Sequence, residues 1–304
     1  MPVLQLFVHL LAVLLAPPLL LGVINRVKAR FAGRRGPPLL QPYYDLVKLM
    51  RKGSVFSRTT TWVFLAGPVV ALSAVFVAAM LVPLGFDRAP IGFEGDLVFF
   101  AYLFGLARFF TVLAALDTGS AFEGMGAARE ATFSCLAEPA LFMGLLAGVR
   151  LSGGLSLGQI LGGGGALPWS AAGAPMVLVV VSFFILLLAE NSRIPFDDPN
   201  THLELTMIHE VMVLDHSGPA FGFVLYGAAL KLFVFAALVV RLVVPLSTLP
   251  PAAEWAAFGA GMLGVAVLIG VVESTMARVR LLQVPRLLVS ACLLSAFGLI
   301  LVAR

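Results

Sequence analysis

Charged residues are scarce in this chain of 304 residues. Asp, Glu, Lys and Arg together make up 12% of the sequence, whereas a soluble domain carries about 25%. Because a water-facing surface needs charged side chains, this content excludes an ordinary soluble protein. Hydrophobic residues make up 60% of the sequence, and the mean hydropathy is +1.02. The sequence therefore predicts an integral membrane protein.

Cysteine is almost absent as well. The chain contains two cysteines, Cys135 and Cys292, which lie far apart. Iron-sulfur clusters and structural zinc sites need more thiolates at closer spacing. We therefore expect neither an iron-sulfur cluster nor a structural zinc site built from this chain's thiolates alone. If the protein serves a redox complex, the redox centres lie in other subunits.

Eight apolar segments are long enough to cross a bilayer, which takes about 20 residues per helix. They predict an all-α, polytopic membrane protein that forms a single membrane domain over residues 1–304. The predicted spans are residues 3–24, 61–84, 97–116, 131–149, 172–189, 219–244, 255–275 and 287–303.

Positive charge is concentrated in the first loop between predicted helices, residues 25–60. This loop holds nine Lys and Arg residues and one acidic residue, Asp45. Since short loops rich in Lys and Arg stay in the cytoplasm, we place this loop there, together with loops 117–130, 190–218 and 276–286. Both termini then face outward from a cell inner (cytoplasmic) membrane. The net charge of +4 marks topology, and we expect no nucleic-acid partner.

A short amphipathic helix is indicated within the first loop. Its apolar residues fall on one side of a helical wheel, and they are Leu40, Tyr43, Tyr44, Val47 and Met50. We expect this helix to lie in the membrane interface, either as a basic surface anchor or as a docking helix for a partner.

Four ionisable residues lie inside predicted spans, where each costs at least about 2.5 to 3.5 kcal/mol at the helix centre. They are Arg108, Glu138, Lys231 and Glu273. A static pairing of Glu138 with Lys231 or Arg108 explains them, and so does a proton relay, since a desolvated carboxylate exchanges protons near neutral pH. Glu130 lies about 12 Å of helical rise from Glu138, so a relay through both needs waters between them.

The densest polar cluster follows the fifth predicted helix and comprises Glu190, Arg193, Asp197, Asp198, His202, Glu204, His209, Glu210, Asp215 and His216. Its histidines recur every seven residues, but the i, i+4 pair that places two imidazoles on one metal is absent, so we expect no metal site. Interleaved apolar residues indicate a structured surface with a short amphipathic helix over about 201–214. No grouping of nucleophile and base indicates hydrolysis, and no catalytic residue is assigned.

Three predicted cytoplasmic segments carry motifs. The first is Gly33-Arg34-Arg35-Gly36-Pro37, followed by Leu40-Gln41-Pro42, Asp45 and Lys48. The second is Gly119-Ser120, Gly126-Ala127 and Arg129, with Glu138 inside the next helix. The third is Ala189-Glu190, Arg193, Pro195-Phe196-Asp197, Pro199 and Glu204-Leu205. In order and spacing they resemble the membrane subunit family shared by respiratory complex I (its subunit 1) and the group 4 membrane-bound [NiFe]-hydrogenases, over nearly the whole chain.

One departure from the complex I pattern resembles the hydrogenase-4 and formate hydrogenlyase branch. Asn200, Thr201 and His202 follow Pro199, where complex I subunits typically continue with further acids, and Lys231 stands in the next helix. The resemblance implies a non-catalytic subunit of an oxidoreductase complex, without a cofactor of its own. The loss of the acids puts quinone binding in doubt.

The resemblance also implies a function. In that family the subunit anchors a peripheral [NiFe]-hydrogenase arm and couples its redox reaction to proton or sodium translocation. The implied partners are the hydrogenase large and small subunits, iron-sulfur electron-transfer subunits and antiporter-like membrane subunits. The residues expected on the proton path are Arg108, Glu130, Glu138, Lys231 and Glu273. Those expected at the junction with partners are Arg34, Arg35, Asp45, Lys48, Arg129, Glu190, Arg193, Asp197, Glu204, His209 and Glu210.

Two alternatives remain. The first is an NADH:quinone oxidoreductase subunit 1 that lines a quinone site. The second, from another class, is a standalone secondary transporter that uses Glu138 and Lys231 as its ion site, although no strong internal repeat supports it. Neighbouring genes for a [NiFe] large subunit, for an NADH module, or for neither would separate the three.

Overall fold

The computed structural model of the chain describes residues 3–86, 88–161, 169–197, 207–244 and 250–304. Within these ranges the secondary structure is helical and no strand is present. Eight helices in this described part are long and apolar enough to cross a membrane. The prediction of an all-α, polytopic membrane protein is confirmed.

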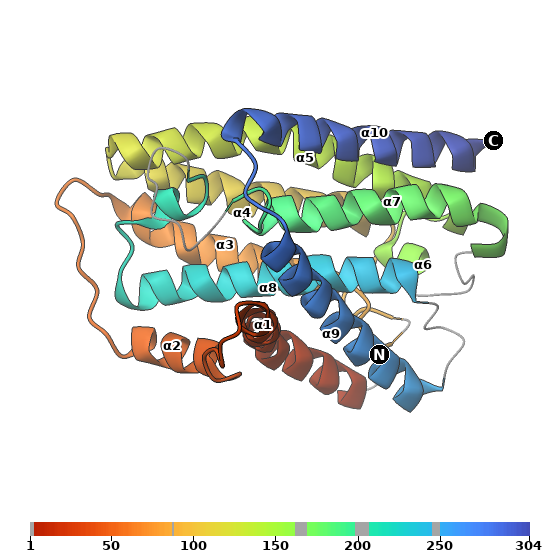
Figure 1. Cartoon of the computed structure of the whole chain (residues 1–304), viewed down its shortest axis with the longest axis horizontal. Coiled ribbons are helices and arrows are strands. Elements are labelled where there is room, and N and C mark those ends of the chain that lie inside the picture. The colour runs from red at the N-terminus through yellow and green to blue at the C-terminus, as the bar shows by residue number, and fades with distance from the viewer. Residues whose placement is uncertain (1–2, 87, 162–168, 198–206, 245–249) are drawn as a thin grey trace.

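The helices in chain order are α1 (Val3–Phe31), α2 (Gln41–Met50), α3 (Trp62–Leu81), α4 (Asp96–Asp117), α5 (Ala121–Ser152), α6 (Leu157–Leu161), α7 (Trp169–Glu190), η1 (Glu210–Val213), α8 (Gly218–Val243), α9 (Pro251–Thr275), η3 (Leu281–Gln283) and α10 (Val284–Ala303). Figure 1 shows α3, α4, α5, α7, α8 and α10 along the long axis of the bundle, with α1 and α9 crossing them obliquely. Both termini lie toward the end opposite the first loop (Figure 1). We call the end with the first loop the basic end and the opposite end the far end.

Two helices extend beyond their predicted spans at the basic end. α1 continues to Phe31, and α5 begins at Ala121. Residues 121–130 of the predicted cytoplasmic loop 117–130 are therefore helical. The charged residues Glu123 and Glu130 suggested a loop here, but both lie within α5. They are buried against neighbouring segments, at 1% and 6% exposure.

The helix predicted over about 201–214 is wrong where the structure describes it. Its first part lies outside the described residues, and the remainder forms a single 3-10 turn, Glu210–Val213. The backbone N–H groups of Ile208 and His209 donate instead to the Asp197 carboxylate, at 3.0 and 3.3 Å. A side chain distant in sequence thus replaces the carbonyls of a preceding helical turn.

The helix predicted in the first loop is present as α2. It lies beside the first turns of α8 (Figure 1), where the Met50 side chain packs against Gly222. Tyr44 and Val47 on its apolar side are 60% and 51% exposed. Tyr44 and Val47 are therefore largely uncovered, whereas Met50 at the end of the same side contacts α8.

Two adjacent prolines, Pro17 and Pro18, lie inside α1. Since proline has no N–H, the carbonyls four residues earlier, those of Val13 and Leu14, lose their usual helical partners. The Tyr226 hydroxyl on α8 lies within hydrogen-bond distance of both oxygens, at 3.3 and 3.1 Å. One side chain therefore compensates the interruption in α1 and joins α1 to α8.

Buried charges fix the helix ends at the far end. The fully buried Asp96 carboxylate accepts from the Leu157 N–H at 2.6 Å and so caps α6. Arg241 on α8 lies 3.0 Å from Glu254 on α9 and donates to the Leu161 carbonyl at 2.9 Å. The sequence pattern predicted no role for these charges. Their contacts connect helices to one another and are structural.

We expect Tyr226→Phe to destabilise the protein by about 1–3 kcal/mol, because it leaves the carbonyls of the buried Val13 and of Leu14 without their hydrogen-bond donor. Thermal unfolding midpoints measured in one detergent test this. Tyr102→Phe on α4, where the ring is 70% exposed, is the matched control and should leave the midpoint unchanged. Equal midpoints for Tyr226→Phe and the unaltered protein would contradict the proposed role of the hydroxyl.

Candidate functional site

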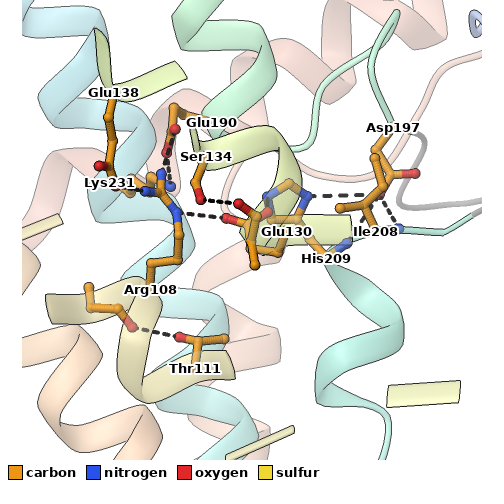
Figure 2. Close-up of polar contacts among 12 residues, drawn as sticks. Arg108, Thr111, Glu130, Ser134, Glu138, Glu190, Asp197, Ile208, His209 and Lys231 are labelled. Atoms are coloured by element: carbon orange, nitrogen blue, oxygen red, sulfur yellow. Dashed lines mark hydrogen bonds and ion pairs between the residues drawn. The ribbon is translucent and has the colours of Figure 1, made fainter. Parts of the chain in front are cut away.

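A chain of ion pairs runs from Lys231, in the middle of α8, to His209 (Figure 2). The Lys231 ammonium lies 2.6 Å from Glu190, whose other oxygen lies 2.6 Å from the Arg108 guanidinium. Arg108 Nε lies 3.0 Å from Glu130, and Glu130 in turn lies 3.0 Å from His209 Nε2. These contacts connect α8, α7, α4 and α5 with the segment before η1.

The chain of ion pairs continues from His209 to Asp197 and Arg278. The Asp197 carboxylate lies 3.9 Å from His209 Nδ1 and 2.9 Å from Arg278 Nη2. Burial alone would lower the pKa of His209, but the carboxylates of Glu130 and Asp197 outweigh it and raise the pKa to about 9. The raised pKa favours the imidazolium form of His209. We call the side chains from Lys231 to Arg278 the charged network, along which the sign alternates at every step.

The centre of the charged network is shielded from solvent. The side chains of Arg108, Glu130 and Glu190 are 9%, 8% and 9% exposed. A buried ion costs several kcal/mol unless opposite charges surround it closely. The alternation of sign therefore lets these ions remain charged inside the bundle.

Arg108 also donates to Glu138 on α5 (Figure 2). Of the two static pairs that the sequence left open, the structure forms the one between Glu138 and Arg108, while Lys231 pairs with Glu190. From the sequence we expected waters between Glu130 and Glu138. The guanidinium contacts both of these carboxylates, and waters on a relay between them stay a prediction.

Glu273 belongs to a separate cluster. Its carboxylate, with a side chain 1% exposed, lies 2.8 Å from Lys28 Nζ and 3.3 Å from Arg193 Nη1. These pairs join α1 and α9 to the segment after α7. The structure therefore places Glu273 apart from Glu138 and Lys231, with which we had grouped it from the sequence.

A cavity of about 820 Å³ lies beside the charged network, bounded by α1, α2, α3, α4 and α8. Leu21, Leu72 and Phe104 are among its apolar lining, and Arg108 and Lys231 are among the charged groups that reach it. Its volume is in the range of small-molecule sites. Its lining suits an amphipathic molecule or a file of waters.

The junction residues of the first loop lie at the basic end. Arg34, Arg35 and Lys48 are exposed. Asp45 on α2 accepts from the Gln41 amide at 2.9 Å and also lines the cavity. These residues are therefore placed where a partner at the basic end would meet them.

The junction residues further along the chain have mixed surroundings. Arg129 donates to the Met207 carbonyl at 2.7 Å and so fixes that segment to α5. Glu210 lines the cavity, and Glu204 lies outside the described residues. Glu190, which the sequence motifs placed at the junction, is a central member of the charged network.

The histidines do not share one site. His209 bonds to Glu130, whereas His216 stacks on Phe64 with ring centroids 4.0 Å apart. His202 lies outside the described residues. In the part of the chain that the structure describes, no group of three His, Cys, Asp or Glu side chains is placed to hold a metal ion.

Besides the pair of Arg241 and Glu254 at the far end, two ion-pair partners nearer the basic end were missed in the sequence. Arg278 and Lys28 belong to groups of cations that we took only as topology signals. Lys28 and Arg278 each follow closely after a predicted span. A long basic side chain at such a position can reach back to a buried carboxylate, and this was the available clue. Which carboxylate each one reaches depends on how the helices pack.

Comparison with known proteins places this architecture in a family. The family described as NADH dehydrogenase matches residues 4–304. Formate hydrogenlyase subunit 4 of Escherichia coli (strain K12) is 32% identical, with 94% of each chain covered. Hydrogenase-4 component C of the same organism is 34% identical over 76% of this chain and 72% of its own. An NADH-quinone oxidoreductase subunit of Rubrobacter xylanophilus is 30% identical over 59% of this chain and 55% of its own.

A solved structure shares the fold. A chain of the membrane-bound sulfane sulfur reductase, an archaeal respiratory membrane complex, superposes with a TM-score of 0.82 at 22% identity, covering 98% of this chain and 97% of that one. The family match over nearly the whole sequence confirms the resemblance drawn from the three motifs. The chain therefore belongs to the NADH dehydrogenase family of membrane proteins, of the complex I subunit 1 type.

Proposed function

We propose that this chain is the membrane subunit of a hydrogenase-4 or formate hydrogenlyase-type complex. It anchors a peripheral [NiFe]-hydrogenase arm and couples the arm's redox reaction to proton or sodium translocation. The similarity to formate hydrogenlyase subunit 4 over 94% of both chains supports the type of complex. The single observation that carries the coupling role is the charged network, because it links the middle of the bundle to the basic end through buried ions.

Because charges of opposite sign alternate along the charged network, a change in one charge alters the proton affinity of its neighbours. Arg108 lies between three carboxylates, those of Glu130, Glu138 and Glu190. When one of these carboxylates takes up a proton, it interacts less strongly with the guanidinium. The guanidinium then stabilises the other two carboxylates more strongly. Charge interactions are strong in a poorly screened interior, so a change at the basic end shifts proton affinity at Glu138 or Glu190. A conformational change of the arm is thereby converted into proton uptake or release.

The chain's own thiols do not supply redox centres. Cys135 on α5 is exposed and Cys292 on α10 is half-buried, and two separate thiols are too few for an iron-sulfur cluster. The [NiFe] and iron-sulfur centres belong to partner subunits in this proposal. The present chain contributes the anchor and the path for the ion.

The anchor role predicts the effect of charge reversal at the basic end. Arg34→Glu with Arg35→Glu should release the peripheral arm while the chain still inserts, because like charges across an interface cost several kcal/mol. We expect the arm subunits recovered with the tagged chain to fall by about tenfold or more. Arg150→Glu, an exposed arginine near the far end, is the matched control. Normal recovery of the arm with the double variant would refute the docking assignment.

The coupling role predicts the behaviour of Glu138→Gln. The amide oxygen still accepts from Arg108, and the side chain is half-exposed, so the complex should assemble. Glutamine carries no exchangeable acid proton, and redox-linked proton uptake into proteoliposomes should fall to background. Glu94→Gln, at an exposed site before α4, is the control. Undiminished uptake would remove Glu138 from the path, and failed assembly would identify a static pair.

The cavity is the observation that favours the alternative, an NADH:quinone oxidoreductase subunit. Its volume and polar end would admit a quinone head group. Against this stands Asn200, where the complex I pattern has an acid. We expect no quinone in the purified complex by solvent extraction and chromatography. Ubiquinone or menaquinone recovered in stoichiometric amount, and reduced by the complex's electron donor, would favour the alternative.

A further inference from the structure

The outward side of α5 differs from the outward sides of its neighbours. Its exposed positions between residues 128 and 139 are small or polar, namely Ala128, Ala131, Thr132, Cys135, Glu138 and Pro139. On α4, α9 and α10 the exposed positions include Phe109, Leu268 and Phe297, which are 57%, 47% and 56% exposed. Large apolar side chains suit lipid, whereas small residues let another helix approach closely.

Glu138 gives this face a second distinguishing feature. It lies on α5 near the midpoint between Arg129 and Arg150, the arginines toward the two ends of that helix. Its side chain is 49% exposed. Ionisable side chains in membrane spans face the bundle interior, a partner or a water-filled cavity, since contact with lipid is costly. A half-exposed carboxylate at this depth therefore needs a cover from outside the chain.

The charge balance around Glu138 indicates which kind of side chain the neighbouring helix presents to it. Arg108 is shared by three carboxylates, but Glu130 has a second cation in His209, and Glu190 has one in Lys231. Among the described residues, the cation that contacts Glu138 is the shared Arg108. A basic side chain on a neighbouring helix would complete the pairing of Glu138.

We propose that a second membrane subunit packs a transmembrane helix against α5 over residues 128–139 and places a basic side chain opposite Glu138. The small residues at positions 128, 131 and 135 admit the close approach, and Glu138 selects the partner by charge. The proposal rests on the proposed function, because it needs a complex with more than one membrane subunit. It places the charged network, through Arg108 and Glu138, in direct contact with the next subunit.

Photo-crosslinking in the intact complex tests this. A photoreactive alkyl-diazirine amino acid replaces Cys135, and in a matched complex it replaces Leu268 on α9, which lies on the other side of the bundle from α5 (Figure 1). Mass spectrometry then identifies the adducts. At position 135 we expect a transmembrane peptide of another membrane subunit that contains Lys, Arg or His. At position 268 we expect lipid.

Ala131→Trp adds a separate readout. A large ring at this position should block the close approach and abolish the adduct at position 135, whereas Leu268→Trp should leave it intact. Lipid alone at position 135, or a second copy of this chain, would overturn the proposal if the hydrogenase subunits are still present in the preparation. A chain that purifies without other subunits would overturn the proposed function as well, so the two failures are distinguishable.

Discussion

Arg108 is a buried cation shared by three carboxylates, and the arrangement of the bundle around it depends on that sharing. The guanidinium has enough donors, in a fixed planar fork, to serve three acceptors from different directions. Through them it joins α4 to α5 and α7, and Glu190 passes the connection to Lys231 on α8. Because removing one member leaves a buried ion with too little opposite charge, these helices are constrained to one relative register.

The same sharing accounts for the proposed coupling. The charged network begins beside a large cavity, reaches the basic end at Arg278, and branches at Arg108 to the outward side of α5. The three branches meet at one cation, so a change in any of them redistributes charge to the others. An arm docked at the basic end and a membrane subunit packed against α5 would thus act on the same group. The similarity to subunits and components of larger enzymes fits this arrangement better than a standalone transporter.

The sequence predicted the features that depend on local composition. Runs of apolar residues defined the eight spans, and the cost of an intramembrane charge singled out Arg108, Glu138 and Lys231. The pairing of Lys231 with Glu190 was not predictable, because it depends on the packing register of α7 and α8. The helix expected over 201–214 failed for a related reason, since Asp197 captures backbone N–H groups from a distance. Motif order identified the family, whereas the contacts between helices required the structure.

This chain is proposed to work inside a hydrogenase complex. The most direct measurement is purification of the tagged chain from its native membrane in a mild detergent, followed by mass spectrometry of every polypeptide that accompanies it. We predict a [NiFe]-hydrogenase large subunit, a small subunit and iron-sulfur subunits in constant ratio to this chain. Recovery with an NADH-oxidising module, or recovery of the chain alone, would contradict the claim.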